Sequence, residues 1–306
     1  MKIRKYIKKT IAIGLIFTLA LSSTACTKKT EGAKAAVKEE TQDEKTDLKD
    51  DAEGSDGVQK IKVAWQTNSY PLQYEDEDGN LTGYEIEVLK LVDEALPQYE
   101  FEFGEPTSQD AQYAGLSAGK YDLVISNAFY TEERDKAYAL PENPLGASLV
   151  GIILPKGTEG VTDFASAAEA GLKLSPILAG DGLYYVVYKY NEENPDNPIE
   201  LEATDSADSF MNSIGWVAEG RYDFAVWPKN YYEQLVTSED GELHDYDEKL
   251  DFYDCRSVYT YPIIRKDEPE VAEAISEVLG KLREEGKLTE LSEKFYGYDA
   301  FKYDSE

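Results

Sequence analysis

The sequence predicts an α/β fold made of two similar lobes. Between Ile61 and Phe103 the residue pattern changes from strand to helix and back to strand, an order that favours an α/β architecture. A short motif then occurs twice, 101 residues apart, and each copy follows a helical pattern. Hydrophobic residues make up 42% of the 306 residues, which is enough for a sizeable core.

The first elements can be read in order. Ile61–Trp65 alternates apolar and polar residues as a strand does, and Glu75–Asn80 is a polar turn around Asp78-Gly79. Tyr84–Leu96 carries a helical apolar face, and the following proline stops the helix. Tyr99–Phe103 returns to strand texture.

The repeated motif defines the two lobes. Gly119–Ile125 (GKYDLVI) matches Gly220–Val226 (GRYDFAV), and helical stretches at 110–118 and 206–219 precede the two copies. Each copy is typical of a helix, a glycine C-cap, a turn and a buried strand. The alternative is a common structural idiom that arose twice.

The positions after the two repeat strands are candidates for a binding cleft. In an open α/β sheet, ligands bind beyond the carboxyl ends of the strands. Ser126-Asn127 in one lobe and Trp227-Pro228 in the other are therefore expected to form facing walls of a cleft.

Composition excludes several function classes. The chain has 31 Lys and Arg against 61 Asp and Glu, a net charge of −30, so nucleic acid is not an expected partner. One His and two Cys argue against most zinc sites, iron–sulfur clusters and disulfide scaffolds, and no metal or cofactor is expected. His244, the only candidate for a catalytic triad, lies in an acidic turn-like stretch and is expected to be a solvated surface residue.

The N-terminus has the parts of a secretory signal. A basic segment without acids, residues 1–10, precedes an apolar run at 11–21 and small residues that end at Cys26. This pattern resembles a bacterial lipoprotein signal, so residues 1–25 are predicted to be removed and Cys26 to carry acyl chains such as palmitate. The chain would then be anchored to the cell membrane on its extracytoplasmic face. The alternative is an ordinary secretory signal with a chance cysteine.

A polar segment separates this signal from the folded part. Residues 27–58 contain no aromatic residue and are rich in Lys, Glu, Asp, Thr and Gly. Such a composition cannot bury enough apolar surface to fold. Residues 26–58 are therefore predicted to be a disordered tether.

Several motifs in the folded part resemble those of one family. They are an opening strand with the family's PF segment at 63–74, a DGNLTGY helix entry at 78–84, LSAGKYD at 116–122, TEER at 131–134, and a closing segment at 261–266, 284–288 and 293–297. Together they resemble the amino-acid-type extracellular solute-binding proteins of ABC importers, solute-binding protein family 3, over Ile61–Gly297.

The resemblance implies a fold and a function. The fold is the type II periplasmic binding protein fold, with two α/β lobes joined by crossing strands near 149–155 and 257–264. Lobe 1 would comprise residues 59–149 and 261–306, and lobe 2 residues 150–260. A monomeric, non-enzymatic lipoprotein would capture an amino acid or a close derivative between the lobes and deliver it to an ABC permease.

The resemblance also implies ligand contacts. Arg134 matches the family's arginine that pairs with the ligand carboxylate, and Thr131 is expected to cap its helix. The other first-lobe positions that match ligand or pocket contacts are Asn127, Phe129, Trp65, Gln66 and Gln109. Core packing is an equal alternative for Trp65 and Phe129.

The second lobe departs from the family pattern. Asp181-Gly182 stands where relatives have a hydroxyl segment, so Gly182 offers only a backbone N–H. Pro228, after Trp227, replaces the acid that usually pairs with the ligand ammonium. Asp181 is the predicted substitute, and Trp227 a predicted ligand contact; the alternative for Asp181 is an ordinary Asp-Gly turn.

Two other functions stay open. A cyclohexadienyl-dehydratase-like enzyme on the same fold would need a pocket acid, for which Glu132, Glu133 and Glu142 are candidates that equally fit solvated surface positions. A solute sensor acting through a partner would bind its ligand in the same way.

Overall fold

A computed structural model describes residues 57–66 and 69–303. The described residues belong to a single compact unit. The predicted signal peptide, Cys26 with its predicted acylation, and nearly all of the predicted tether lie outside them.

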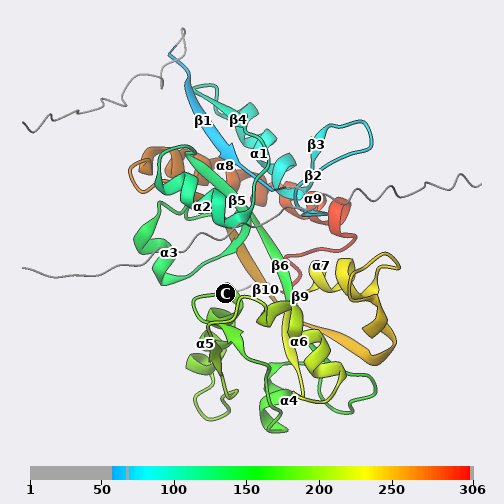
Figure 1. Cartoon of the computed structure of the whole chain (residues 1–306). Coiled ribbons are helices and arrows are strands. Elements are labelled where there is room, and N and C mark those ends of the chain that lie inside the picture. Colours follow the sequence, from blue (N-terminus) through cyan, green and yellow to red (C-terminus); the bar gives the residue numbers. More distant parts are fainter. Residues whose placement is uncertain (1–56, 67–68, 304–306) are drawn as a thin grey trace, which may run out of the picture. The chain divides into compact units, whose positions relative to one another are not determined.

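A six-stranded mixed sheet runs through the unit in the order β4-β1-β5-β10-β6-β9 (Figure 1). Its strands are β1 Gln59–Ala64, β4 Tyr99–Phe103, β5 Leu123–Phe129, β6 Gly146–Pro155, β9 Ala225–Pro228 and β10 Leu250–Ile264. Two short pairs complete the strands: β2 Tyr74–Glu75 with β3 Leu81–Thr82, and β7 Ile177–Leu178 with β8 Ala203–Thr204.

The helices flank both ends of this sheet. They are α1 Tyr84–Ala95, α2 Gln109–Ser117, α3 Glu132–Ala137, α4 Phe164–Glu169, α5 Gly182–Glu193, α6 Ser209–Ala218, α7 Lys229–Tyr232, α8 Pro269–Glu284 and α9 Lys287–Tyr296. A π-turn, Glu233–Thr237, extends α7, and a 3₁₀ turn covers His244–Lys249. Within the part of the chain that the structure describes, none of the helices has the length and apolar composition needed to cross a bilayer.

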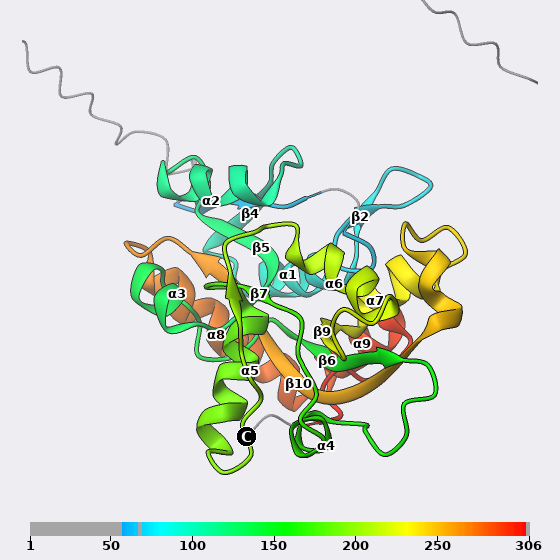
Figure 2. The same ribbon diagram turned by 60° about the horizontal axis from the view of Figure 1, so that its bottom comes forward.

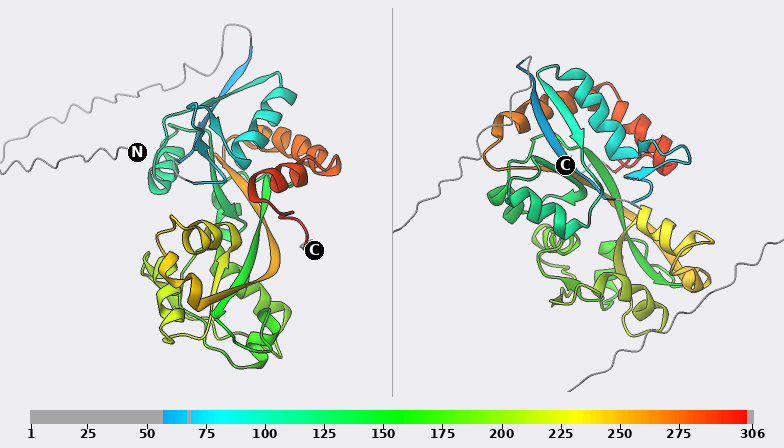
Figure 3. Two further views of the ribbon diagram at one scale, coloured as in Figure 1. Left: turned by 90° about the vertical axis from the view of Figure 1, so that its right-hand side faces the viewer. Right: turned by 45° about the horizontal axis from the view of Figure 1, so that its top comes forward.

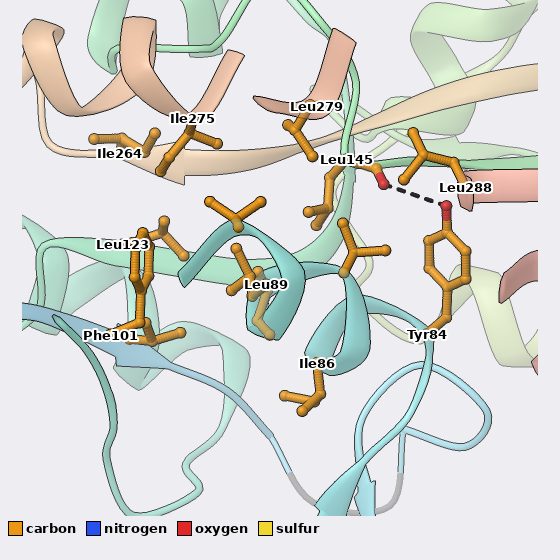
Figure 4. Close-up of a cluster of buried hydrophobic side chains, with 14 of the residues drawn as sticks. Tyr84, Ile86, Leu89, Phe101, Leu123, Leu145, Ile264, Ile275, Leu279 and Leu288 are labelled. Atoms are coloured by element: carbon orange, nitrogen blue, oxygen red, sulfur yellow. Dashed lines mark hydrogen bonds between the residues drawn. The ribbon is translucent and has the colours of Figure 1, made fainter. Parts of the chain in front are cut away.

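The first lobe has its own core. β1 pairs in parallel with both β4 and β5, and α1, α8 and α9 bury their apolar faces in one cluster. Figure 4 shows Ile86 and Leu89 of α1 in this cluster with Leu279 of α8 and Leu288 of α9. The Tyr84 hydroxyl donates to the Leu145 carbonyl at 3.3 Å, so the one buried phenol in this view has a partner.

Two long antiparallel strands connect the lobes. β6 and β10 pair from Gly146↔Thr260 to Pro155↔Leu250, and Figures 1 and 2 both show them side by side between the two groups of helices. β10 pairs with β5 through Thr260–Ile264, whereas β6 pairs with β9 through Val150–Ile153. The predicted crossings at 149–155 and 257–264 fall within these strands, and the exact lobe boundaries stay a prediction.

The second lobe packs around the other ends of these strands. One cluster gathers Val150 and Ile152 of β6 with α4 and α5, and another joins Ile153 and Trp227 to α6 and α7. The segment after α9 then returns to the crossing strands (Figure 3, left), where the Tyr303 N–H donates to the Ser257 hydroxyl at 3.1 Å and Lys302 Nζ to Asp254 Oδ2 at 2.7 Å.

The repeated motif has the structure that the sequence predicts. Gly119 and Gly220 end α2 and α6 with φ of 72° and 73°, a left-handed conformation that favours glycine. The aspartates that follow also match, since Asp122 Oδ2 accepts the Lys62 N–H at 2.9 Å and Asp223 Oδ2 the Lys173 N–H at 2.7 Å. Asp122 thus connects its turn to β1, and Asp223 connects its turn to the segment before β7.

The other predicted elements are also present. The expected strand at 61–65 is β1, the expected helix at 84–96 is α1 with Leu96 as its C-cap, and the expected strand at 99–103 is β4. The polar turn joins β2 to β3, where Asp76 Oδ1 accepts the Asp78 and Asn80 N–H groups at 3.0 and 2.8 Å.

Candidate functional site

A cavity of about 270 Å³ lies between the lobes, and we call it the cleft cavity. The ends of β5 and β9 and the first turns of α2, α5 and α6 contribute to its walls. Its lining residues are Gln109, Ser126, Asn127, Ala128, Phe129, Arg134, Asp181, Gly182, Leu183, Phe210, Pro228 and Tyr231. Six of the nine predicted contacts are in this set, namely Gln109, Asn127, Phe129, Arg134, Asp181 and Gly182.

Arg134 is held in place by its own helix. Thr131 is the N-cap of α3, and its hydroxyl accepts the Arg134 N–H at 3.1 Å, as the sequence predicts. The guanidinium reaches back, and Nη1 donates to the Phe129 carbonyl at 2.6 Å. This hydrogen bond holds the Arg134 guanidinium at the carboxyl end of β5, where it can bind a ligand carboxylate.

Asn127 lies in a left-handed conformation at the same end of β5. Its φ is 51°, which asparagine tolerates better than most residues do. Its Oδ1 accepts the Ser148 hydroxyl of β6 at 3.0 Å, and its N–H donates to Glu85 Oε1 at 3.0 Å. Asn127 is thereby connected both to the crossing strand and to a buried acid of α1.

Glu85 is the buried acid beneath this wall, and sequence reasoning missed it. Only 1% of the residue is exposed, and its second oxygen accepts Gln73 Nε2 at 2.5 Å. Gln73 also donates to the Ile125 carbonyl at 3.1 Å and accepts the Gln66 N–H at 2.9 Å. Burial raises the pKa of Glu85 to about 7, although the bonds from Gln73 and Asn127 oppose that rise.

Asp181 begins the second wall. It is the N-cap of α5, and Oδ1 accepts the Leu183 N–H at 2.7 Å. Burial raises the pKa of Asp181, an effect that the Leu183 bond and the positive charge of Arg134 oppose. Asp181 thus caps a helix, as an Asp-Gly turn residue can, and also lines the cleft cavity with Arg134.

Gly182 allows α5 to approach β5 closely. A Cβ added at this position would come within 2.8 Å of the Phe129 Cβ, a distance that side chains do not tolerate. Phe129 itself is 6% exposed and belongs to the hydrophobic cluster of the second lobe. It therefore packs across the lobes and also lines the cavity, so both alternatives given for it apply.

Trp65, Gln66 and Trp227 are not among the lining residues. Trp65 is 3% exposed, and its Nε1 donates to the Gly104 carbonyl at 2.6 Å, so it is a core residue of the first lobe. Gln66 is connected to the site through its backbone N–H on Gln73. The packing alternative describes Trp65, because its ring turns inward once β1 has ended.

Trp227 is a supporting residue of the second wall. It is fully buried, and its Nε1 donates to the Ser213 hydroxyl at 2.8 Å. Its ring stacks on Phe210 with centroids 4.0 Å apart and planes at 11°, and Phe210 lines the cavity. Trp227 therefore acts on the cavity through Phe210, because successive residues of β9 face opposite sides and it is Pro228 that faces the cleft.

Phe210 and Tyr231 are lining residues that the sequence analysis did not name. The repeat contained the signal, because its 101-residue offset carries Gln109 onto Phe210 and Asn127 onto Pro228. No sequence pattern of this kind points to Tyr231. Burial raises the pKa of the Tyr231 hydroxyl.

The other candidates lie away from this cavity. Glu132, Glu133 and Glu142 are exposed and are not among its lining residues. His244 is half-buried, with Nδ1 3.1 Å from the Val236 carbonyl. Burial raises the pKa of the Cys255 thiol to about 12, which keeps it protonated as a packed residue of the second lobe.

Comparisons with known proteins give the family. The model of the bacterial extracellular solute-binding proteins, family 3, matches residues 61–298. The L-cystine-binding protein TcyJ of Bacillus subtilis is 24% identical over 247 residues, with 80% of this chain and 87% of the relative covered. TcyA, an L-cystine-binding protein of the same organism, is 26% identical over 265 residues, with 83% and 90% covered.

Solved structures agree on the fold. One comes from a study of glutathione import in Gram-positive bacteria via GshT and the cystine ABC importer TcyBC of Streptococcus mutans. It is 24% identical, covers 79% of this chain and 96% of its own, and has a TM-score of 0.56. The family match spans most of the chain and includes both walls of the cleft cavity. This chain belongs to the bacterial extracellular solute-binding proteins, family 3.

Proposed function

We propose that this chain captures a zwitterionic amino acid, with L-cystine as the first candidate, in the cleft cavity and delivers it to an ABC permease. The observation that carries the proposal is the pair of opposite charges on the cavity walls, Arg134 from the first lobe and Asp181 from the second. The guanidinium fits the ligand carboxylate and the Asp181 carboxylate fits its ammonium. Cystine is chosen because the relatives TcyJ and TcyA are named for it.

The Arg134 test measures cystine binding by titration calorimetry. Arg134→Ala is expected to weaken binding about tenfold or more, because losing a charge-assisted contact costs about 1.5–3 kcal/mol. Arg221→Ala is the matched control, since Arg221 stacks on Trp216 at 4.8 Å and is not among the residues that line the cleft cavity. Equal affinities in the two variants would contradict the assignment of Arg134.

Asp181 allows a test of the ammonium contact without loss of the helix cap. Asparagine caps helices about as well as aspartate does, so Asp181→Asn removes the charge and keeps an acceptor for the Leu183 N–H. The variant is expected to lose affinity for amino acids and to keep its affinity for carboxylic acids that lack the amino group. An equal loss of affinity for both classes of ligand would mean that Asp181 only caps α5 and does not contact the ligand ammonium.

The enzyme and the sensor remain the competing functions. We infer that the chain is not an enzyme, because its family is one of solute-binding proteins and the candidate acids Glu132, Glu133 and Glu142 are exposed and do not line the cleft cavity. Turnover of a cyclic carboxylic acid by the purified protein would contradict this inference. Uptake of labelled cystine by cells with and without the chain separates an importer from a sensor.

The anchoring proposal concerns residues outside the described structure. Cys26 is proposed to carry the acyl chains, and the mature protein to be a monomer on the extracytoplasmic face of the membrane. Cys26→Ala is expected to release the protein from the membrane fraction and to abolish labelling by palmitate. Labelling that survives in this variant would refute the assignment.

A further inference from the structure

We propose that a second cavity, at the junction of the crossing strand β10 with helix α5, binds a small aromatic carboxylate. This hinge cavity has a volume of about 270 Å³. Four tyrosines and two cations dominate its walls, namely Tyr130, Tyr185, Tyr259, Tyr261, Lys189 and Arg256. The site goes beyond amino-acid capture and does not depend on it.

The hinge cavity draws its walls from both lobes. Tyr130 directly follows β5, Tyr261 lies in the first-lobe half of β10, and Tyr185 and Lys189 lie one and two turns into α5. Phe129 contributes to both cavities, and it is the one residue that their linings share. The hinge cavity is therefore a separate space on the other side of Phe129.

A break in strand pairing accompanies this cavity. Among the described residues, β10 pairs with β6 from Leu250 to Thr260, but with β5 only from Thr260 to Ile264. On its β5 side, β10 therefore has no strand partner in the residues that precede Thr260, and residues 256–259 of this stretch line the hinge cavity. Backbone polar groups of a strand edge are available to a ligand in the same way as side chains.

The tyrosines suit a flat ring. The ring centre of Tyr130 lies 6.0 Å from that of Tyr185 and 6.4 Å from that of Tyr261, and the ring planes meet at 58° and 68°. Aromatic rings prefer such tilted and edge-to-face partners at separations of about 4.5–7 Å, so an inserted ring would find ring faces and edges on adjoining walls. The volume, at the lower end of small-molecule sites, limits the ligand to about one ring with a short substituent.

The charges select an acid. Arg256 Nη1 lies 3.9 Å from Glu193 Oε2, the outer limit of an ion pair, so a ligand carboxylate can compete for this guanidinium. Lys189 Nζ pairs with Glu192 at 2.7 Å and lies 5.4 Å from the Tyr185 ring centre, so a ligand carboxylate competes with Glu192 for Lys189 as it competes with Glu193 for Arg256. Glu193 is the one acid in the lining, against two cations.

The test uses benzoate as the probe and titration calorimetry as the readout. Cyclohexanecarboxylate has the same charge without a π system, and benzamide has the ring without the charge. Benzoate is expected to bind saturably with a Kd in the millimolar range or below, and each analogue to bind at least several-fold more weakly. No saturable benzoate binding, or equal binding of cyclohexanecarboxylate, would overturn the proposal.

Variants locate the binding. Arg256→Gln and Lys189→Gln are each expected to weaken benzoate binding about tenfold, a contact worth about 1.4 kcal/mol, and Arg221→Gln is the matched control. Two variants guard against a local folding defect, and a circular dichroism spectrum and melting temperature close to those of the native chain show that each one is folded. If Arg256→Gln and Lys189→Gln both bind benzoate as tightly as the native chain does, benzoate does not bind in the hinge cavity and the proposal is overturned.

Arg134→Ala separates the two cavities. It is expected to leave benzoate binding unchanged, because Arg134 is not among the residues that line the hinge cavity. Loss of benzoate binding in this variant would place the acid in the cleft cavity and overturn the proposal. Benzoate binding that stays intact in Arg134→Ala, whether or not cystine binds the native chain, would support the proposal.

Discussion

Glu85 gives a prediction about stability and pH. Its carboxyl is buried under the cleft cavity, and burial raises its pKa from 4.5 to about 7. In the unfolded chain this acid ionises near its ordinary pKa, whereas in the folded chain it stays protonated until about pH 7. The folded state thus binds more protons between these values, and the free energy of unfolding falls as the pH rises through them.

The magnitude follows from the shift. A rise from 4.5 to about 7 corresponds to about 3 kcal/mol, because each pKa unit is worth about 1.4 kcal/mol. This contribution is fully present below pH 4.5 and fully lost above about pH 7. Glu85→Gln carries no titrating proton, so it should remove this part of the pH dependence.

The assay is urea unfolding of the native chain and Glu85→Gln across this pH range. The quantity compared is the slope of stability against pH, because loss of the bond to Gln73 changes the absolute stability of the variant as well. Glu87→Gln, on the same helix, is the control: its pKa is lowered, with Lys90 and Thr82 donating to its carboxylate, so the sign of its effect is opposite. Parallel curves for the native chain and Glu85→Gln would refute the reasoning.

Three further substitutions test how the site is built. Thr131→Ala removes the cap of α3 and should cost about 1 kcal/mol of stability, measured by denaturant unfolding, with weaker cystine binding. Gly182→Ala places a Cβ 2.8 Å from that of Phe129 and should cost about 1–3 kcal/mol, visible as a lower melting temperature. Asp223→Ala removes the acceptor of the exposed Lys173 N–H and should cost about 0.5–1.5 kcal/mol, measured as the urea midpoint.

Each of these has a conservative control. Thr131→Ser keeps the capping hydroxyl and Asp223→Asn keeps an acceptor oxygen, so both should recover most of the loss. Gly104→Ala meets its nearest atom, on Tyr121, at an ordinary 3.5 Å and should be tolerated. If a control is as unstable as its test variant, the named contact is not the cause.

The sequence predicted the elements better than the site because local patterns determine the elements. The apolar face of α1, the alternation in β1 and the glycine ends of the repeat are visible within a few residues. Of the four residues expected on the facing walls, Ser126, Asn127 and Pro228 line the cleft cavity and Trp227 does not.

Side-chain direction at the strand ends could not be predicted in the same way. Trp65 and Trp227 follow strand residues and look accessible in sequence, yet one ring turns to the Gly104 carbonyl and the other packs behind Phe210. In the sequence, nothing distinguishes Glu85 from the other acidic residues of α1. Its burial depends on Gln73 and Asn127, which the chain brings to it from 12 residues before and 42 residues after.

The shared strand β10 determines how the molecule comes apart. One continuous hydrogen-bonded strand supplies pairing to β5 in the first lobe and to β6 along the crossing, so neither lobe can lose its order without exposing an edge of the other. Heating should therefore melt both lobes in one cooperative step, with equal calorimetric and van't Hoff enthalpies. A ligand that touches a single wall of either cavity would then raise the melting temperature of the whole unit.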